Sequence, residues 1–115
     1  MSHFSTVKTE LRQRESLVSA LEDLGYAPKQ GGHPVRGYRG QTVEAELAVT
    51  LQDSADFGFV WNEANGAYEF VTDLDLWRQS MPIERFLSRL TQRYALNTVL
   101  KASLTEGFDV AEQRD

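Results

Sequence analysis

Apolar and polar residues alternate most regularly over residues 41–51 of the chain. The apolar positions of this stretch are Val43, Ala45, Leu47, Val49 and Leu51. A period of two predicts a strand with one buried side and one side in water, as antiparallel sheets have. A looser alternation with β-branched residues predicts a first strand over residues 3–11, and a short edge strand is expected over residues 26–29.

Two further strands are predicted over residues 57–62 and 67–73, because they flank Asn65-Gly66, a strong signal for a β-hairpin. If those two residues form the turn, the expected cross-strand pairs are Trp61 with Phe70 and Val60 with Val71. Aromatic side chains then stack on one face of the hairpin, at roughly 0.2–1 kcal/mol per pair. Gly58, inside the first strand, indicates a bulge or the close approach of another chain segment.

Two helices are predicted from apolar residues at helical spacing. The first covers about residues 12–24 and ends before Gly25, a residue type favoured just after a helix. The second begins near Pro82, and its apolar stripe comprises Ile83, Phe86, Leu87, Leu90 and Tyr94, continued by Val99, Leu100 and Leu104. Asn97-Thr98 is a possible interruption, so one long helix and two shorter ones both remain open.

Beyond the second helix, residues 108–110 are a possible last strand, and residues 112–115 are expected to be a frayed tail. The resulting order, β-α-β-β-β-β-α-(β), is typical of an α+β fold. We expect a single domain over residues 1–115. Its sheet should be mostly antiparallel, with roughly four to six strands and two main helices on one face.

The composition narrows the function classes. The chain has 115 residues, of which 41% are apolar and 25% are charged, as in an ordinary globular domain. It has no cysteine, which excludes disulfides, thiol nucleophiles and thiolate metal sites. No stretch approaches the roughly 20 apolar residues of a membrane span, and the polar start lacks the apolar region of a signal peptide. We therefore expect a cytoplasmic domain without a membrane span.

The charge is uneven along the chain. Residues 1–40 carry six cations and four acids, a net charge of +2, whereas residues 41–115 carry six cations and thirteen acids, a net charge of −7. A net charge of −5 argues against nucleic-acid binding, because contacts to phosphates dominate that affinity. A local basic patch can still bind an anion.

The best candidate for such a patch is a predicted loop over residues 30–40, which holds four of the eight glycines. Backbone amides around glycines can form an anion-binding hollow, and Lys29, Arg36 and Arg39 add charged donors. Tyr38 lies between the two arginines, where it can stack on a ring. The loop lacks the Gly-Lys-Ser/Thr signature of a phosphate loop, so a plain solvated connection is the other interpretation.

Catalytic chemistry has weaker support. His3 and His33 are the only histidines, no helical H-x-x-x-H spacing exists, and no third nitrogen ligand is available for a metal. Acids gather near the predicted strand ends, at Asp53, Asp56, Glu63, Asp73 and Asp75. Paired carboxylates can divide acid and base roles, although acids in turns usually bind local amides. We predict neither a cofactor nor a metal.

Aromatic residues concentrate around the predicted hairpin, at Phe57, Phe59, Trp61, Tyr68, Phe70 and Trp77. Core packing accounts for most of them, and a protein-binding patch is the alternative, since tryptophan and tyrosine are favoured in interfaces.

Five stretches of the chain together resemble one protein family. They are residues 2–5 (SHFS), 35–41 (VRGYRGQ), 57–62 (FGFVWN), 66–73 (GAYEFVTD) and 87–95 (LSRLTQRYA). The family is the hypothetical chloroplast open reading frame thirty-five family, a domain of unknown function found in cyanobacteria and algal plastid genomes, with bacterial relatives. The resemblance covers nearly the whole chain. It implies a photosynthetic lineage and a cytosolic or stromal compartment, with no assigned activity and no known cofactor.

We expect a non-enzymatic accessory or interaction domain that binds a protein partner or a small anionic ligand. The residues predicted to do so are Lys29, His33, Arg36, Gly37, Tyr38, Arg39, Gly40 and Trp61. One alternative is a small enzyme or small-molecule sensor that uses His3 or His33 with nearby carboxylates. A weaker alternative is RNA binding through residues 36–40, and the oligomeric state stays open.

Overall fold

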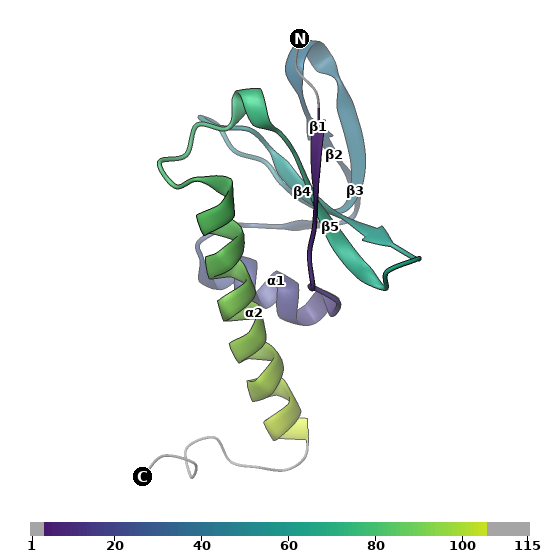
Figure 1. The fold of residues 1–115 in the computed structure, drawn as a ribbon, viewed down its shortest axis with the longest axis vertical. Helices are drawn as coiled ribbons and strands as arrows, with labels where there is room; N and C mark the ends of the chain where they lie inside the picture. The colour runs from purple at the N-terminus through teal and green to yellow at the C-terminus, as the bar shows by residue number, and fades with distance from the viewer. Residues whose placement is uncertain (1–3, 106–115) are drawn as a thin grey trace.

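A computed structural model describes residues 4–105 of the chain as one antiparallel sheet with two helices packed on it (Figure 1). The elements are β1 (Phe4–Lys8), α1 (Arg14–Asp23), β2 (Lys29–Arg36), β3 (Thr42–Val49), β4 (Phe57–Asn62), β5 (Ala67–Asp73) and α2 (Ile83–Thr105). Two short 3-10 turns, η1 (Tyr38–Gly40) and η2 (Leu74–Leu76), follow β2 and β5. The predicted α+β fold class and element order are confirmed, while the possible strand at 108–110, the tail at 112–115 and His3 lie outside the described residues.

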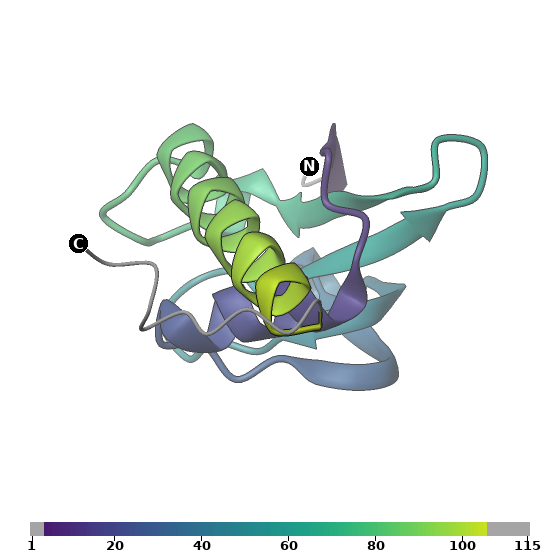
Figure 2. The ribbon, with the colours of Figure 1, turned by 90° about the horizontal axis from the view of Figure 1, so that it is seen from below.

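The sheet has the strand order β1-β5-β4-β3-β2, and each neighbouring pair is antiparallel. Its edges are therefore β1 and β2. Both helices lie on the same face, and the view from below shows α2 crossing α1 (Figure 2). Within the described residues no helix is long and apolar enough to cross a membrane.

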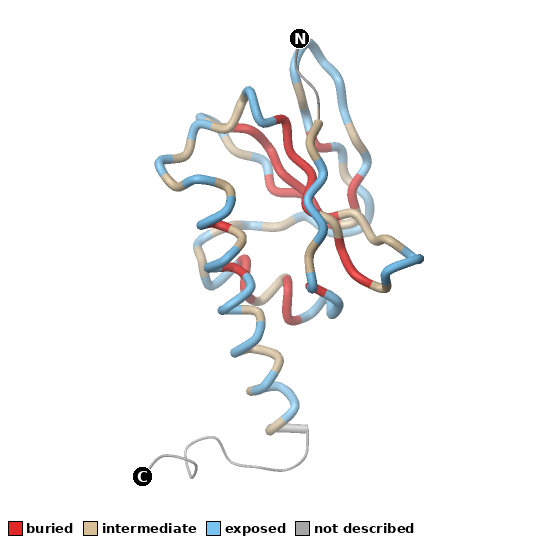
Figure 3. The backbone as a smooth tube through the Cα atoms, in the orientation of Figure 1, coloured by how far each residue is buried: buried red, intermediate tan, exposed pale blue. Residues whose placement is uncertain are grey.

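The main core lies between this face and the helices. Its largest fully buried side chains are aromatic: Phe57 and Phe59 from β4, Phe70 from β5 and Phe86 from α2. Phe57 has its ring centroid 5.0 Å from that of Phe86, so the sheet and α2 are joined through aromatic contacts. Buried positions accordingly concentrate in the central strands (Figure 3).

The glycine-rich stretch is mostly a strand, so the predictions of a strand at 26–29 and of a loop at 30–40 are wrong. β2 begins at Lys29, and its register against β3 shifts between Gln30 and His33. Gly31 and Gly32 fill that shift with φ angles of 91° and 83°, so they form a β-bulge within the strand. Glycine suits a bulge for the same reason that it suits a loop, and the composition alone does not separate the two.

The hairpin has a longer turn than predicted. Asn62 pairs with Ala67, which leaves residues 63–66 in the connection, and the Gly66 N–H donates to the Asn62 carbonyl at 2.9 Å. The observed cross-strand pairs are Trp61 with Tyr68, Phe59 with Phe70 and Val60 with Glu69, which corrects the predicted partners of Trp61 and Val60. The register differs by two residues, so every side chain keeps its face and the aromatic residues still point toward the helices.

The alternating apolar side chains of residues 41–51 do not all lie on the same face of the sheet. Leu47 and Val49 belong to the main core, but Ala45 packs with Val35 and Ala48 in a small cluster on the other face. The change occurs beside Glu46, opposite the β2 bulge, where the regular pleat is interrupted. Gly58 allows this cluster to close, since a Cβ there would lie 2.6 Å from Val35 Cγ2, and the predicted close approach at Gly58 is confirmed.

The end of α1 and the interior of α2 can both be related to the sequence. α1 ends at Asp23, and Gly25 follows two residues later with a φ of 95°. The Gly25 N–H is bonded to the Glu22 carbonyl and the Tyr26 N–H to the Leu21 carbonyl. α2 is a single helix that continues through residues 97 and 98. Within α2, the Asn97 side chain links the two helices, because it donates to Asp23 Oδ2 of α1 at 2.9 Å.

Candidate functional site

The loop at residues 36–41, called here the 36–41 loop, is anchored at its first residue by a buried carboxylate. Asp56, just before β4, is 3% exposed and accepts three hydrogen bonds from Arg36: from the backbone N–H at 3.1 Å, from Nε at 2.7 Å and from Nη2 at 2.9 Å. Burial acts to raise the pKa of the Asp56 carboxyl, but the hydrogen bonds from Arg36 and Leu51 outweigh it, and the pKa lies below its ordinary value.

A second buried carboxylate holds the middle of the loop. Asp73 at the end of β5 is fully buried, and its Oδ2 accepts the Tyr38 N–H at 3.1 Å while its Oδ1 accepts the Asp75 N–H at 3.1 Å. Gly37 lies against β1, because a Cβ at that position would lie 2.6 Å from Phe4 Cζ. The loop is therefore fixed at three places that are distant in sequence: to β1, to the end of β5 and to Asp56 just before β4.

Beside the Arg36 side chain, which binds Asp56, the loop presents a tyrosine and an arginine to solvent. Tyr38 is 39% exposed, Arg39 is exposed as well, and the Arg39 guanidinium carbon lies 5.2 Å from the centre of the Tyr38 ring. Among the described residues, Arg39 is the one non-glycine residue with a positive φ, at 55°. This left-handed conformation disfavours a side chain with a Cβ, and Gly40 follows it with a φ of 78°.

The structure brings together some of the predicted site residues and separates others. Arg36, Gly37, Tyr38, Arg39 and Gly40 form the 36–41 loop. Lys29 lies at the other end of β2, seven residues from Arg36 or roughly 20 Å along an extended strand. His33 lies within β2, half-buried, and its side chain makes no hydrogen bond or ion pair within residues 4–105.

Trp61 is not brought to the loop. It pairs with Tyr68 near the start of β5, whereas the loop contacts Asp73 at the end of the same strand. Five residues of extended chain separate those two positions, roughly 17 Å.

Trp61 instead lines a separate cavity of about 390 Å³, together with Arg12, Arg14, Glu46 and Tyr68. We call it the Trp61 pocket. The sequence pattern indicated Trp61, and Tyr68 as part of the aromatic cluster, but not the three charged residues, because these come from the segment before α1, from α1 and from β3. Two arginines separated by one residue were the only local signal.

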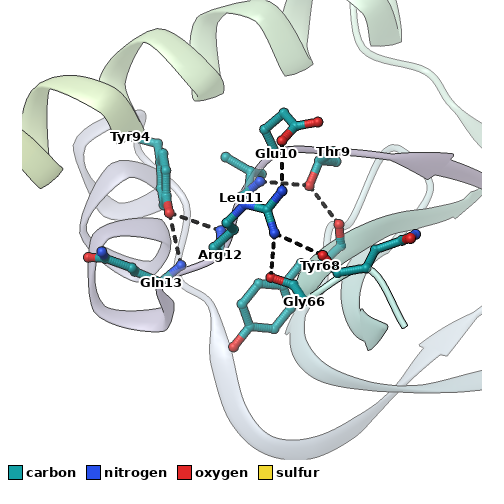
Figure 4. A network of polar contacts seen from close by, with 9 residues as sticks. Thr9, Glu10, Leu11, Arg12, Gln13, Gly66, Tyr68 and Tyr94 are labelled. Carbon is teal, nitrogen blue, oxygen red and sulfur yellow. Dashed lines mark hydrogen bonds and ion pairs between the residues drawn. The ribbon is translucent and has the colours of Figure 1, made fainter. Parts of the chain in front are cut away.

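The segment before α1 is held by a network of polar contacts (Figure 4). The Tyr94 hydroxyl of α2 accepts the backbone N–H groups of Arg12 and Gln13, each at 2.9 Å. The Arg12 guanidinium donates to the carbonyls of Asn65 and Gly66 in the hairpin turn at 2.8 and 3.0 Å. Residues 12–13 thus connect α2 with the β4–β5 hairpin at the edge of the Trp61 pocket.

The predicted alternative to a binding module is an enzyme or sensor that uses a histidine with nearby carboxylates. Within residues 4–105 no group of three or more histidine or acidic side chains could hold a metal ion. Of the acids near strand ends, Asp56 and Asp73 accept hydrogen bonds from the 36–41 loop, which accounts for their burial. His3 lies outside the described residues.

Comparison with known proteins places the chain among proteins without an assigned activity. Residues 20–115 match the family described as "Protein of unknown function (DUF1257)". The uncharacterized protein ycf35 of Guillardia theta is 40% identical over 108 residues, which cover 94% of this chain and 83% of that protein. The uncharacterized protein ycf35 of Cyanophora paradoxa is 30% identical over 113 residues, 98% of this chain and 87% of that protein. No solved structure matches the chain significantly.

Proposed function

This chain belongs to the DUF1257 family of proteins of unknown function, and we propose that it acts there as a non-enzymatic interaction module that binds a partner protein through the 36–41 loop. The observation that carries the proposal is the use of two buried carboxylates, Asp56 and Asp73, to hold an exposed loop. The expected setting is the cytoplasm, or the plastid stroma in algal relatives, as the resemblance implies.

The energetic cost of the 36–41 loop supports a role in binding. Burying a carboxylate is unfavourable unless it is well hydrogen-bonded, and two strands can be joined by a turn of two residues that needs no such support. The 36–41 loop keeps Asp56 and Asp73 inside the protein and holds Arg39 in a left-handed conformation. Strained non-glycine residues cluster at functional sites, so the strain at Arg39 supports a role in binding.

The side chains that the loop exposes also support a role in binding. Tyrosine and arginine are enriched among the residues that dominate binding energy in protein interfaces. A loop already fixed in one conformation loses little entropy on binding. Arg39 has no acidic neighbour in the loop, so its guanidinium favours a partner surface that offers a carboxylate near an apolar or aromatic group.

The test is a quantitative comparison of bound proteins. Tagged wild type and the double variant Tyr38→Ala/Arg39→Ala are used to capture proteins from an extract of the native cells, with Arg85→Ala, an exposed arginine on α2, as the matched control. We expect at least one protein captured by the wild type and by Arg85→Ala to fall about tenfold or more with the double variant. An identical set of captured proteins with all three would contradict the proposal.

A further inference from the structure

The Trp61 pocket has the size and lining of a small-molecule site. Its cavity of about 390 Å³ lies within the usual range of roughly 300–1,000 Å³ for ligand pockets. It lies at the Tyr68 end of β5, away from the 36–41 loop at the Asp73 end, so its role is independent of the proposed protein interaction.

Two aromatic side chains form its apolar wall. Trp61 of β4 and Tyr68 of β5 face each other across the strands, with ring centroids 5.0 Å apart and an angle of 72° between the rings. Trp61 is half-buried and Tyr68 is 4% exposed, so a ligand can reach the Trp61 ring, while the nearly covered Tyr68 ring holds it in place. Such a wall favours the side chain of an apolar or aromatic ligand.

The charged side chains of the pocket are of opposite sign but are not in direct contact. Arg14 and Glu46 line the same cavity and attract each other electrostatically, yet they form no close ion pair. Glu46 uses Oε1 to accept the Trp61 backbone N–H at 3.1 Å, and within the described residues its Oε2 has no hydrogen-bond donor. Arg14 makes one long hydrogen bond, from Nε to the Tyr68 hydroxyl at 3.5 Å.

Arg12 differs from Arg14, because its guanidinium already donates to the Asn65 and Gly66 carbonyls and to Glu10. The pocket therefore offers one available cation and one available carboxylate beside an aromatic wall. A simple anion would meet the charge of Glu46, and a simple cation would meet two arginines. A ligand that carries both charges satisfies both sides.

We propose that the Trp61 pocket binds a free α-amino acid with an apolar or aromatic side chain. Its carboxylate pairs with Arg14, its ammonium group pairs with Glu46, and its side chain packs on the Trp61 ring next to Tyr68. The site is open to water, so the dissociation constant should be weak, about 0.1–1 mM.

The two tryptophans of the chain give a direct readout, since Trp61 lines the pocket and Trp77, which donates from its indole N–H to the Met81 carbonyl, does not. The probe is L-phenylalanine, titrated while the two indole N–H resonances are followed by NMR. We expect a saturable shift of the Trp61 resonance, with little change at Trp77. N-acetyl-L-phenylalanine, which lacks the ammonium group, and phenethylamine, which lacks the carboxylate, should each bind about tenfold or more weakly.

Variants separate the two charges. Arg14→Gln and Glu46→Gln should each weaken L-phenylalanine binding about tenfold or more, and the glutamine at 46 keeps an oxygen for the Trp61 N–H. Arg85→Gln is the matched control and should bind as the wild type does. The proposal is overturned if L-phenylalanine gives no saturable shift of Trp61 up to about ten times that expected constant. It is also overturned if N-acetyl-L-phenylalanine or phenethylamine binds as tightly as L-phenylalanine, or if both pocket variants bind normally.

Discussion

The 36–41 loop and the Trp61 pocket both combine arginine with aromatic side chains, but they use their charges differently. In the loop, Arg36 is held by Asp56 and contributes to structure, whereas the exposed Arg39 pairs with no carboxylate of the described residues. In the pocket, Arg12 is held by the hairpin turn and Arg14 is left facing the cavity. In each region one arginine fixes the backbone and its neighbour two or three positions away is available for a ligand. In an arginine-rich stretch, arginines bound to the protein's own carboxylates or carbonyls therefore have to be separated from arginines that face solvent or a cavity before a function is assigned.

The largest expected effect is the loss of the carboxylate that fixes the loop. Asp56→Ala leaves the Arg36 and Leu51 N–H groups without their buried acceptor, and we expect the free energy of unfolding to fall by about 2–3 kcal/mol. Urea denaturation measures it. Asp53→Ala, at an exposed acid three residues earlier, is the control and should stay within about 0.5 kcal/mol of the wild type. Equal stability of the two variants would mean that Asp56 does not anchor the loop.

Close packing of Gly37 on β1 gives the next effect. Gly37→Ala places a Cβ against the Phe4 ring, so the unfolding free energy should fall by about 1–2 kcal/mol. The double variant Phe4→Ala/Gly37→Ala removes the clash, and the two changes should then be less destabilising together than their sum. Additive effects in this double-mutant cycle would show that a side chain at position 37 does not clash with the Phe4 ring.

On the pocket side, Tyr94→Phe removes the hydroxyl that accepts the Arg12 and Gln13 N–H groups. We expect a loss of about 1 kcal/mol in the free energy of unfolding, and a smaller L-phenylalanine-induced shift of Trp61 because Arg14 follows this segment directly. Tyr38→Phe removes a hydroxyl without a partner in the described part of the chain and should leave stability unchanged. A Tyr94→Phe protein as stable as Tyr38→Phe would argue against the anchoring role.

The smallest effect is on pH dependence. The pKa of Asp56 is lower in the folded chain than in the unfolded chain, so its ionised form stabilises the fold above about pH 4 and this contribution is lost as the pH falls further. Between about pH 5 and pH 2 the unfolding free energy of the wild type should therefore fall more steeply than that of Asp56→Asn. Parallel curves for the two proteins would contradict a lowered pKa.

The sequence predicted the fold class, the element order and the placement of the hairpin's aromatic residues on one face, because these follow from local periodicity. It did not predict the β2 bulge or the four-residue hairpin turn, since glycine serves bulges, loops and turns alike. The family resemblance is confirmed by the similarity to the ycf35 proteins of Guillardia theta and Cyanophora paradoxa, together with the DUF1257 match over residues 20–115. The anchoring of the 36–41 loop by Asp73 and the lining of the Trp61 pocket depend on contacts between distant segments, and no local pattern of residues reports those.

The most direct test of the proposed role of the 36–41 loop is Arg39→Gly, measured for both stability and partner capture. Glycine removes the left-handed strain of roughly 1–2 kcal/mol but adds entropy to the unfolded chain, so the unfolding free energy should stay within about 1 kcal/mol of the wild type. Capture of the partner protein should fall about tenfold or more. A variant whose unfolding free energy falls by about 2 kcal/mol or more would contradict the proposed role, because Arg39 would then serve the fold. A variant that captures the partner as well as the wild type does would also contradict it, because Arg39 would then not take part in binding.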